Sequence, residues 1–185
     1  MKNPFTLTFG KIPENIINRD QEIDKVYTDF VSENPSSNVY LISGVRGSGK
    51  TILMSQIADK IRNEKDFIVI DLNPERDILT SIACNLSSKN DIAKIFKSAK
   101  INFSAFGLSL EINNDKKTSD ISVTLDKMFE SLKNKNKKVL LTIDEITSRP
   151  NIREFIAEFQ IYMCKNYNVF FTCSWSNGKY HRVTK

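Results

Sequence analysis

The chain has 185 residues, of which 40% are hydrophobic and 26% charged, which is enough apolar material for one folded domain and too much for a disordered chain. Its longest apolar runs are about five residues, far below the roughly 20 that cross a bilayer, so we expect no membrane segment. The net charge of +5 permits an acidic or phosphorylated partner without requiring one.

The cysteines and the single histidine limit the kinds of metal site and catalysis that the chain can support. Cys84, Cys164 and Cys173 are odd in number and lack CxxC spacing, which favours buried thiols in a reducing compartment over a zinc site. His181 is the only histidine, so nucleophilic catalysis that needs a histidine base is disfavoured. The start of the chain lacks the apolar stretch of a secretory signal. We therefore expect a cytoplasmic protein that works through carboxylates, lysine, backbone amides or a bound metal.

The first predicted elements alternate between helix and strand. Apolar residues at helical spacing predict a helix over 20–31, with Asp20 as its N-cap. A short apolar run predicts a strand at 39–43, and helical spacing returns from 50 to about 62. Residues 67–72, FIVIDL, have the pattern of a buried strand.

The middle of the chain is less regular. Asn73 and Pro74 predict a helix start, with asparagine as the cap and proline at the first helical position, and this helix continues through Leu86. Residues 101–112 alternate between apolar and small or polar side chains, so we interpret residues 98–119 as a hairpin insertion.

The last third returns to regular alternation. Helical spacing predicts helices over 121–132 and 152–163, and apolar runs predict strands at 139–143 and 169–173. Helices that alternate with short buried strands favour the α/β class, with a parallel sheet flanked by helices.

One segment carries a specific motif. Residues 44–51, GVRGSGKT, fit the Walker A pattern GxxxxGK[ST] between a predicted strand and a predicted helix. In such a loop the backbone N–H groups curl around phosphate oxygens and the helix N-terminus supplies positive potential. Lys50 would reach the β and γ phosphates of a nucleotide, and the Thr51 hydroxyl would ligate Mg²⁺. The expected nucleotide-binding residues are Gly44, Val45, Arg46, Gly47, Ser48, Gly49, Lys50, Thr51 and Ile52.

A second motif follows a later strand. Residues 139–145, VLLTIDE, end an apolar strand in two acids, as a Walker B motif does. Asp144 would hold the Mg²⁺ shell, and Glu145 would orient the attacking water. Acids after a strand are also common turn residues, so this signal depends on the first motif. We see no constellation of acids and arginines for a phosphoryl acceptor, which favours hydrolysis over transfer.

Taken together, GVRGSGKT, LLTIDE and NPFTLTFGKIPENIINRDQEI resemble AAA+/STAND-type P-loop ATPases. More narrowly, the chain resembles archaeal-ATPase-like bacterial ATP-binding proteins related to the origin-recognition and helicase-loader clade. The resemblance covers residues 3–173. It implies a three-layer P-loop NTPase core over residues 1–173, with a Walker A unit at 37–66 and a Walker B unit at 138–150.

The resemblance also implies two further site residues. In such proteins an Arg-acid-x-acid box lies near the adenine, and Arg19 begins the matching residues here, although Asp20 beside it has the alternative of simply capping a helix. A polar sensor residue ends the strand after Walker B, which points to Thr172. A threonine that merely fills a strand position is an equal alternative.

The last residues depart from the family pattern. Residues 174–185, SWSNGKYHRVTK, have no apolar period and no acid. One codon choice read one base later gives a family-like continuation, so we hypothesise a frameshift, with an ordinary divergent C-terminus as the alternative. Relatives continue into a fifth core strand, an arginine finger and a helical lid, and we therefore expect a C-terminally truncated core without a lid.

The sequence thus predicts an ATP-binding protein with Mg²⁺-dependent ATP hydrolysis, acting as a switch or motor. One alternative is a truncated nucleotide-binding remnant with weak or no hydrolysis. Another is a DNA-associated loader or initiator, which is weakly supported because residues 174–185 supply three of the five net positive charges. A homo-oligomer or an unknown protein partner stays open, and no membrane partner is expected.

Overall fold

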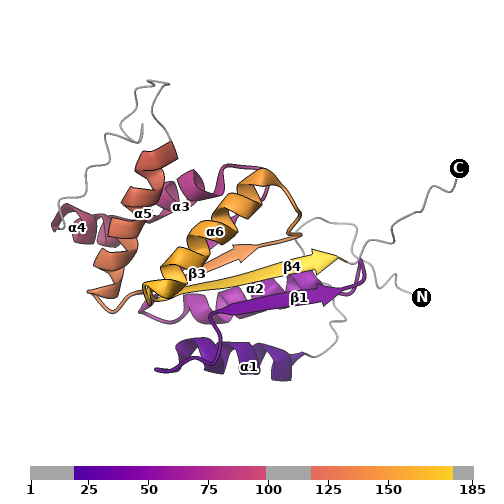
Figure 1. Ribbon diagram of the computed structural model, residues 1–185. Helices are drawn as coiled ribbons and strands as arrows, with labels where there is room; N and C mark the ends of the chain where they lie inside the picture. Colours follow the sequence, from indigo (N-terminus) through magenta and orange to yellow (C-terminus); the bar gives the residue numbers. More distant parts are fainter. Residues whose placement is uncertain (1–18, 99–117, 177–185) are drawn as a thin grey trace, which may run out of the picture.

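In the part of the chain that the structure describes, a four-stranded parallel sheet carries helices on both faces (Figure 1). The computed structural model describes residues 19–98 and 118–176. The strands lie in the order β1-β4-β3-β2, and their bounds are Val39–Gly44 for β1, Phe67–Leu72 for β2, Lys138–Ile143 for β3 and Val169–Ser176 for β4. The helices are α1 (Asp20–Val31), α2 (Lys50–Arg62), α3 (Ile78–Ser88), α4 (Asn90–Ser98), α5 (Thr118–Lys133) and α6 (Pro150–Cys164).

The alternation of side chains along each strand produces two cores, one on each face of the sheet. In β3, Val139, Leu141 and Ile143 point into the core built with α3, α4, α5 and α6. Leu140, between them, points into the core built with α1 and α2. The predicted three-layer α/β arrangement is therefore confirmed.

Helix α1 is fixed to α2 by apolar and polar contacts. Ile23, Val26 and Phe30 are buried at helical spacing and share a core with residues of α2. Next to this core, the Lys60 ammonium lies 2.5 Å from Asp24, and the Tyr27 hydroxyl donates to Glu64 at 2.5 Å. These contacts hold α1 against α2.

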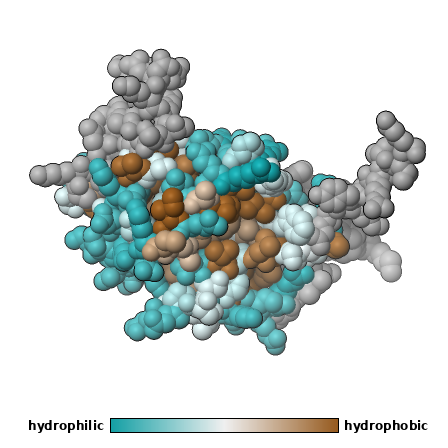
Figure 2. Space-filling model, viewed as in Figure 1, coloured by the Kyte–Doolittle hydropathy of each residue, from teal (hydrophilic) through white to brown (hydrophobic). Residues whose placement is uncertain are grey.

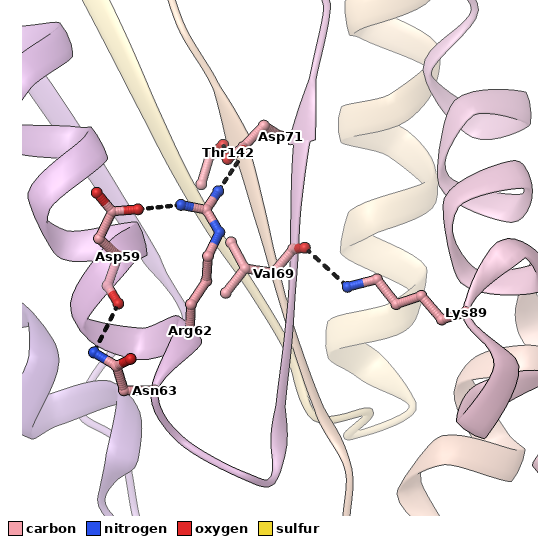
Figure 3. Close-up of polar contacts among 7 residues, drawn as sticks. All are labelled: Asp59, Arg62, Asn63, Val69, Asp71, Lys89 and Thr142. Carbon is pink, nitrogen blue, oxygen red and sulfur yellow. Dashed lines mark hydrogen bonds and ion pairs between the residues drawn. The ribbon is translucent and has the colours of Figure 1, made fainter. Parts of the chain in front are cut away.

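The two edges of the sheet differ. On β2, the Lys89 ammonium donates to the Val69 carbonyl at 3.5 Å (Figure 3). In the described part of the chain β1 pairs only with β4, and Val39 and Leu41 are 40% and 55% exposed on the α6 side of the sheet. Hydrophobic side chains gather in the middle of this side of the molecule (Figure 2). Trp175 at the end of β4, which is paired with Ser43, is 47% exposed.

Two predicted helix starts and one missed helix are corrected by the structure. The N-cap of α1 is Arg19, without a side-chain cap bond, and Asp20 is the first helical residue. Helix α3 starts at Ile78 because the Asn73 side chain instead accepts the Glu75 N–H at 2.9 Å in a separate turn, and Asp77 caps the helix. Helix α4 was not predicted.

Two other predictions concern a hairpin and membrane segments. The predicted hairpin at 101–112 is outside the described residues. Within the described residues, no helix combines the length and the apolar character needed to cross a membrane.

Asp29 organises the loop between α1 and β1, and we expect its removal to destabilise the fold. Its carboxylate accepts from the backbone and hydroxyl of Ser36 at 2.6 and 2.9 Å, from the Ser37 N–H at 3.1 Å and from the Tyr40 hydroxyl at 2.7 Å. Partial burial raises the pKa of Asp29, but these hydrogen bonds outweigh it, and the net pKa lies below the usual 3.8. Asp29→Asn should cost about 1 to 2 kcal/mol of unfolding free energy at pH 7.

The pH dependence of this effect has a defined sign. A carboxyl whose pKa is lowered in the folded state stabilises the fold fully above its unfolded pKa, and this contribution disappears as the pH falls through the folded value. The difference in urea unfolding between the parent and Asp29→Asn should therefore be largest at pH 7, begin to shrink near pH 3.8, and disappear only below the lowered folded pKa. Asp91→Asn, which removes a highly exposed acid on α4, is the control. A difference independent of pH would contradict this role.

Candidate functional site

Residues 44–51, which we call the phosphate loop, connect the end of β1 to the start of α2. Gly47 and Gly49 have φ values of 82° and 81°, a left-handed conformation that glycine adopts without steric cost. A Cβ added to Gly44 would lie 2.9 Å from the Ser48 hydroxyl oxygen, closer than side-chain atoms pack. The path of the loop therefore depends on glycine at Gly47 and Gly49, whereas a side chain at position 44 would only require the Ser48 hydroxyl to turn away.

Positive charge gathers at the N-terminus of α2. The Lys50 side chain is only 6% exposed, and its ammonium donates to the Val45 carbonyl at 2.9 Å. The first turn of α2 carries no acid, so its N–H groups and dipole add to this potential. Arg19 donates to the Ser48 carbonyl at 2.7 Å, and Arg46 is exposed on the loop. Such an arrangement suits a polyanion.

The remaining loop positions have simpler surroundings. Val45 is 65% exposed at the tip of the loop. Ile52 is half-buried in the first turn of α2.

The two sequence motifs meet in space. The Thr51 hydroxyl donates to Asp144 Oδ2 at 2.7 Å, although the two residues are 93 positions apart in the chain. A hydroxyl and a carboxylate are hard oxygen donors of the kind that Mg²⁺ prefers. Among the described residues no group of three or more His, Cys, Asp or Glu side chains gathers as a metal site. Two hard oxygen donors this close together fit Mg²⁺, an ion that usually keeps water and phosphate oxygens as its other ligands.

Glu145 occupies an unusual backbone conformation. Its φ is 54°, which is uncommon for residues other than glycine and is held only where neighbouring contacts enforce it. Its N–H donates to the Ser174 hydroxyl at 2.9 Å and lies 3.1 Å from Asp144 Oδ1. The Glu145 side chain is exposed, and the Ser176 hydroxyl lies 3.5 Å from its carboxylate.

Ser174 is a site residue that the sequence analysis missed. Its side chain is fully buried, its hydroxyl donates to Asp144 Oδ1, and its carbonyl accepts the Ile146 N–H at 2.8 Å. It thereby fixes both Asp144 and the turn that carries Glu145. A polar residue at the end of the last strand was the available signal, but the predicted strand ended at residue 173, whereas β4 continues to Ser176.

Thr172, the predicted sensor residue, is not brought to Asp144. It lies two residues earlier in β4, in register with Thr142 and Tyr40. Its side chain is fully buried, and its hydroxyl has no hydrogen-bond partner within the described part of the chain. The strand period explains this, because Thr172 and Ser174 share one face of the sheet but only Ser174 reaches its end.

A cavity of about 330 Å³ opens beside Thr51 and Asp144, between α2 and the strands β2 and β3. Along its wall the Arg62 guanidinium is held between Asp59 and Asp71 (Figure 3). Asp71 also accepts from the Thr142 hydroxyl at 2.7 Å. This chain of contacts connects the C-terminal end of α2 to β2 and β3, so the helix that begins at the phosphate loop is anchored at both ends.

The cysteines only partly follow the prediction of buried thiols. Cys173 is buried, and burial raises the pKa of its thiol to about 11. Cys84 is partly exposed, and burial followed by the charge of Asp77 raises its pKa. Cys164 is exposed, so the prediction is wrong for it. Cys173, adjacent to Ser174, is protonated at neutral pH and adds no thiolate to the site.

The strand order and the position of the phosphate loop are those of an AAA+-like P-loop fold. The phosphate loop follows β1, the acids follow β3, and β4 lies between these two strands in the sheet. Residues 16–178 match the model of a family described as an ATPase domain predominantly from Archaea, and the chain belongs to this family. The match extends five residues past the predicted end of the core at 173.

Two solved structures share the fold. Cdc6p from Pyrobaculum aerophilum superposes with a TM-score of 0.55 at 17% identity, over 92% of this chain and 42% of its own. The Orc1 protein of Aeropyrum pernix, solved in complex with DNA, gives 0.52 at 15% identity over 89% of this chain and 40% of its own. The chain thus spans about two fifths of either protein. No curated protein matches the chain. The predicted resemblance to archaeal-type ATPases is confirmed by the family match, and the two structures show that the fold is shared with origin-recognition proteins.

Proposed function

We propose that the chain binds ATP together with Mg²⁺ at the phosphate loop and hydrolyses it. The observation that carries this proposal is the 2.7 Å contact between Thr51 and Asp144, which unites two motifs from distant parts of the sequence. The positive charge at the N-terminus of α2 lies directly beside this pair. Membership of an ATPase domain family supports the same substrate.

Different residues would bind the phosphate groups and the Mg²⁺ ion. The backbone N–H groups of the phosphate loop and the Lys50 ammonium would contact the phosphate oxygens, and Lys50 would exchange its bond to the Val45 carbonyl for them. Thr51 and Asp144 would hold the Mg²⁺ ion, which neutralises phosphate charge when bound. The positive end of α2 adds a favourable field for the same oxygens.

Glu145 would orient and polarise the attacking water, since its carboxylate is exposed beside Asp144 and its backbone is fixed. Ser174 supports this by holding the Glu145 N–H and Asp144 at once. A hydrolytic cycle of this kind would serve as a switch or motor for a partner.

Replacing Lys50 by alanine tests the binding site. ATP with Mg²⁺ at about 100 times its dissociation constant should stabilise the parent by about 2.7 kcal/mol, which raises the melting temperature by roughly 5 to 10 °C for a chain of this size. Lys50→Ala should remove this shift because the phosphate charge loses its buried partner. Lys65→Ala, which changes an exposed lysine after α2, should keep it. An unchanged shift in Lys50→Ala would refute the site.

A second candidate function is DNA association, favoured by one observation, the fold shared with an Orc1 protein solved in complex with DNA. The charge of residues 1–173 is only +2, which is the total of +5 less the three positive charges of residues 174–185. Support would come from duplex DNA binding whose affinity falls steeply with salt.

A further inference from the structure

Arg19 lies at the junction of α1 and the phosphate loop. As the residue just before α1, it donates from Nη2 to the Ser48 carbonyl at 2.7 Å, across 29 positions of sequence. The contact is possible because α1 is docked on α2 through its buried face and through the pair of Asp24 with Lys60. Because α1 is held against α2, the position of Arg19 relative to the phosphate loop is fixed.

The accepting carbonyl belongs to the peptide that joins Ser48 to Gly49. In a planar trans peptide the C=O and the N–H point in opposite directions, so a carbonyl held by Arg19 turns the Gly49 N–H away from Arg19. Gly49 has a φ of 81° and no Cβ, so rotation of this peptide meets little steric resistance. Without the Arg19 guanidinium, the sequence of the phosphate loop would favour one orientation of the Ser48–Gly49 peptide only weakly.

The charge around this peptide indicates the kind of ligand. Arg19 is brought close to the start of α2, where buried Lys50 and the helix dipole already concentrate positive potential. A polyphosphate offsets the repulsion between these cations. This relief of repulsion depends on the phosphate groups of a ligand and not on its nucleobase.

We propose that Arg19 is a positioning residue that sets the Ser48–Gly49 peptide for phosphate binding, so that it serves ATP, GTP and free tripolyphosphate alike. The inference rests on the proposed function. It differs from the expectation of a residue on the adenine side, because Arg19 acts here through the loop.

Binding of ATP and of inorganic tripolyphosphate, each with Mg²⁺, to the full chain tests the proposal. Arg19→Ala should bind both ligands about tenfold more weakly, the order expected for loss of one charge-assisted hydrogen bond. Arg19→Lys keeps a charged donor and should lose less. Lys25→Ala, which changes an exposed lysine of α1, should bind as the parent does. The melting temperature without ligand should stay within a few degrees in every variant.

Other outcomes overturn the proposal. Weaker ATP binding with unchanged tripolyphosphate binding would assign Arg19 to the base, and unchanged binding of both would leave it no role. If Arg19→Ala fails to fold, equal losses for both ligands in Arg19→Lys support the proposal, and a loss confined to ATP overturns it. If Lys50→Ala bound ATP as tightly as the parent does, the proposed site would be wrong. That result does not depend on Arg19, so it tests the proposed function separately.

Discussion

Glu145→Gln is expected to keep ATP bound and to stop its hydrolysis. Glutamine preserves the size of the side chain and can occupy the same turn, but it cannot accept a proton from water, so the rate should fall by about 10² to 10⁴. ATP-induced stabilisation should be unchanged because Glu145 does not line the phosphate loop. The measurement is single-turnover hydrolysis of labelled ATP, with binding followed in parallel.

The control and the contrary outcomes are distinct. Glu154→Gln alters an exposed acid on α6 and should hydrolyse as the parent does. If Glu145→Gln turned over ATP as fast as the parent, the role assigned to Glu145 would be wrong. If the parent bound ATP but did not hydrolyse it, the chain would be a nucleotide-binding protein without turnover.

Asp144→Asn is expected to remove most of the Mg²⁺ dependence of ATP binding. The amide can still accept from Thr51, but it lacks the charge that holds a hard cation. Loss of even an outer-shell partner of a metal ligand costs about 10- to 100-fold in metal affinity, so loss of the Asp144 charge should lower ATP affinity in Mg²⁺ toward the value in chelator. The measurement is titration of ATP with Mg²⁺ and with EDTA.

Asp71→Asn is the matched control for Asp144, because Asp71 lines the same cavity and also bonds a threonine hydroxyl. It lies on β2 and contacts Arg62 and Thr142, not Thr51, so its Mg²⁺ dependence should match that of the parent. A full Mg²⁺ effect in Asp144→Asn would contradict the proposed ligand role.

The candidate nucleotide site was predictable where its residues are contiguous in sequence. The glycines of the phosphate loop, Lys50 and Thr51 occupy one eight-residue segment, and their spacing is itself the signal. Asp144 could be added because acids at the ends of parallel strands meet at one edge of the sheet. The strands were predictable for a similar reason, since each is a short apolar run.

What was missed depends on packing and register. Ser174 reaches Asp144 only because β4 is paired so that Cys173 lies beside Ile143, and the apolar run that marked the strand stops before its true end. The contact of Arg19 with Ser48 requires α1 to dock on α2, which no local pattern states. The Asn73 side chain accepts the Glu75 N–H in a local turn, and so it does not cap a helix that starts at Pro74.

Trp175 gives the chain a built-in optical probe. It is the only tryptophan, it is about half exposed at the end of β4, and it pairs with Ser43 just before the phosphate loop. Its neighbours Ser174 and Ser176 contact Asp144 and Glu145. Tryptophan emission therefore arises from a single place beside the site, and ligand titrations can be followed on the unlabelled protein.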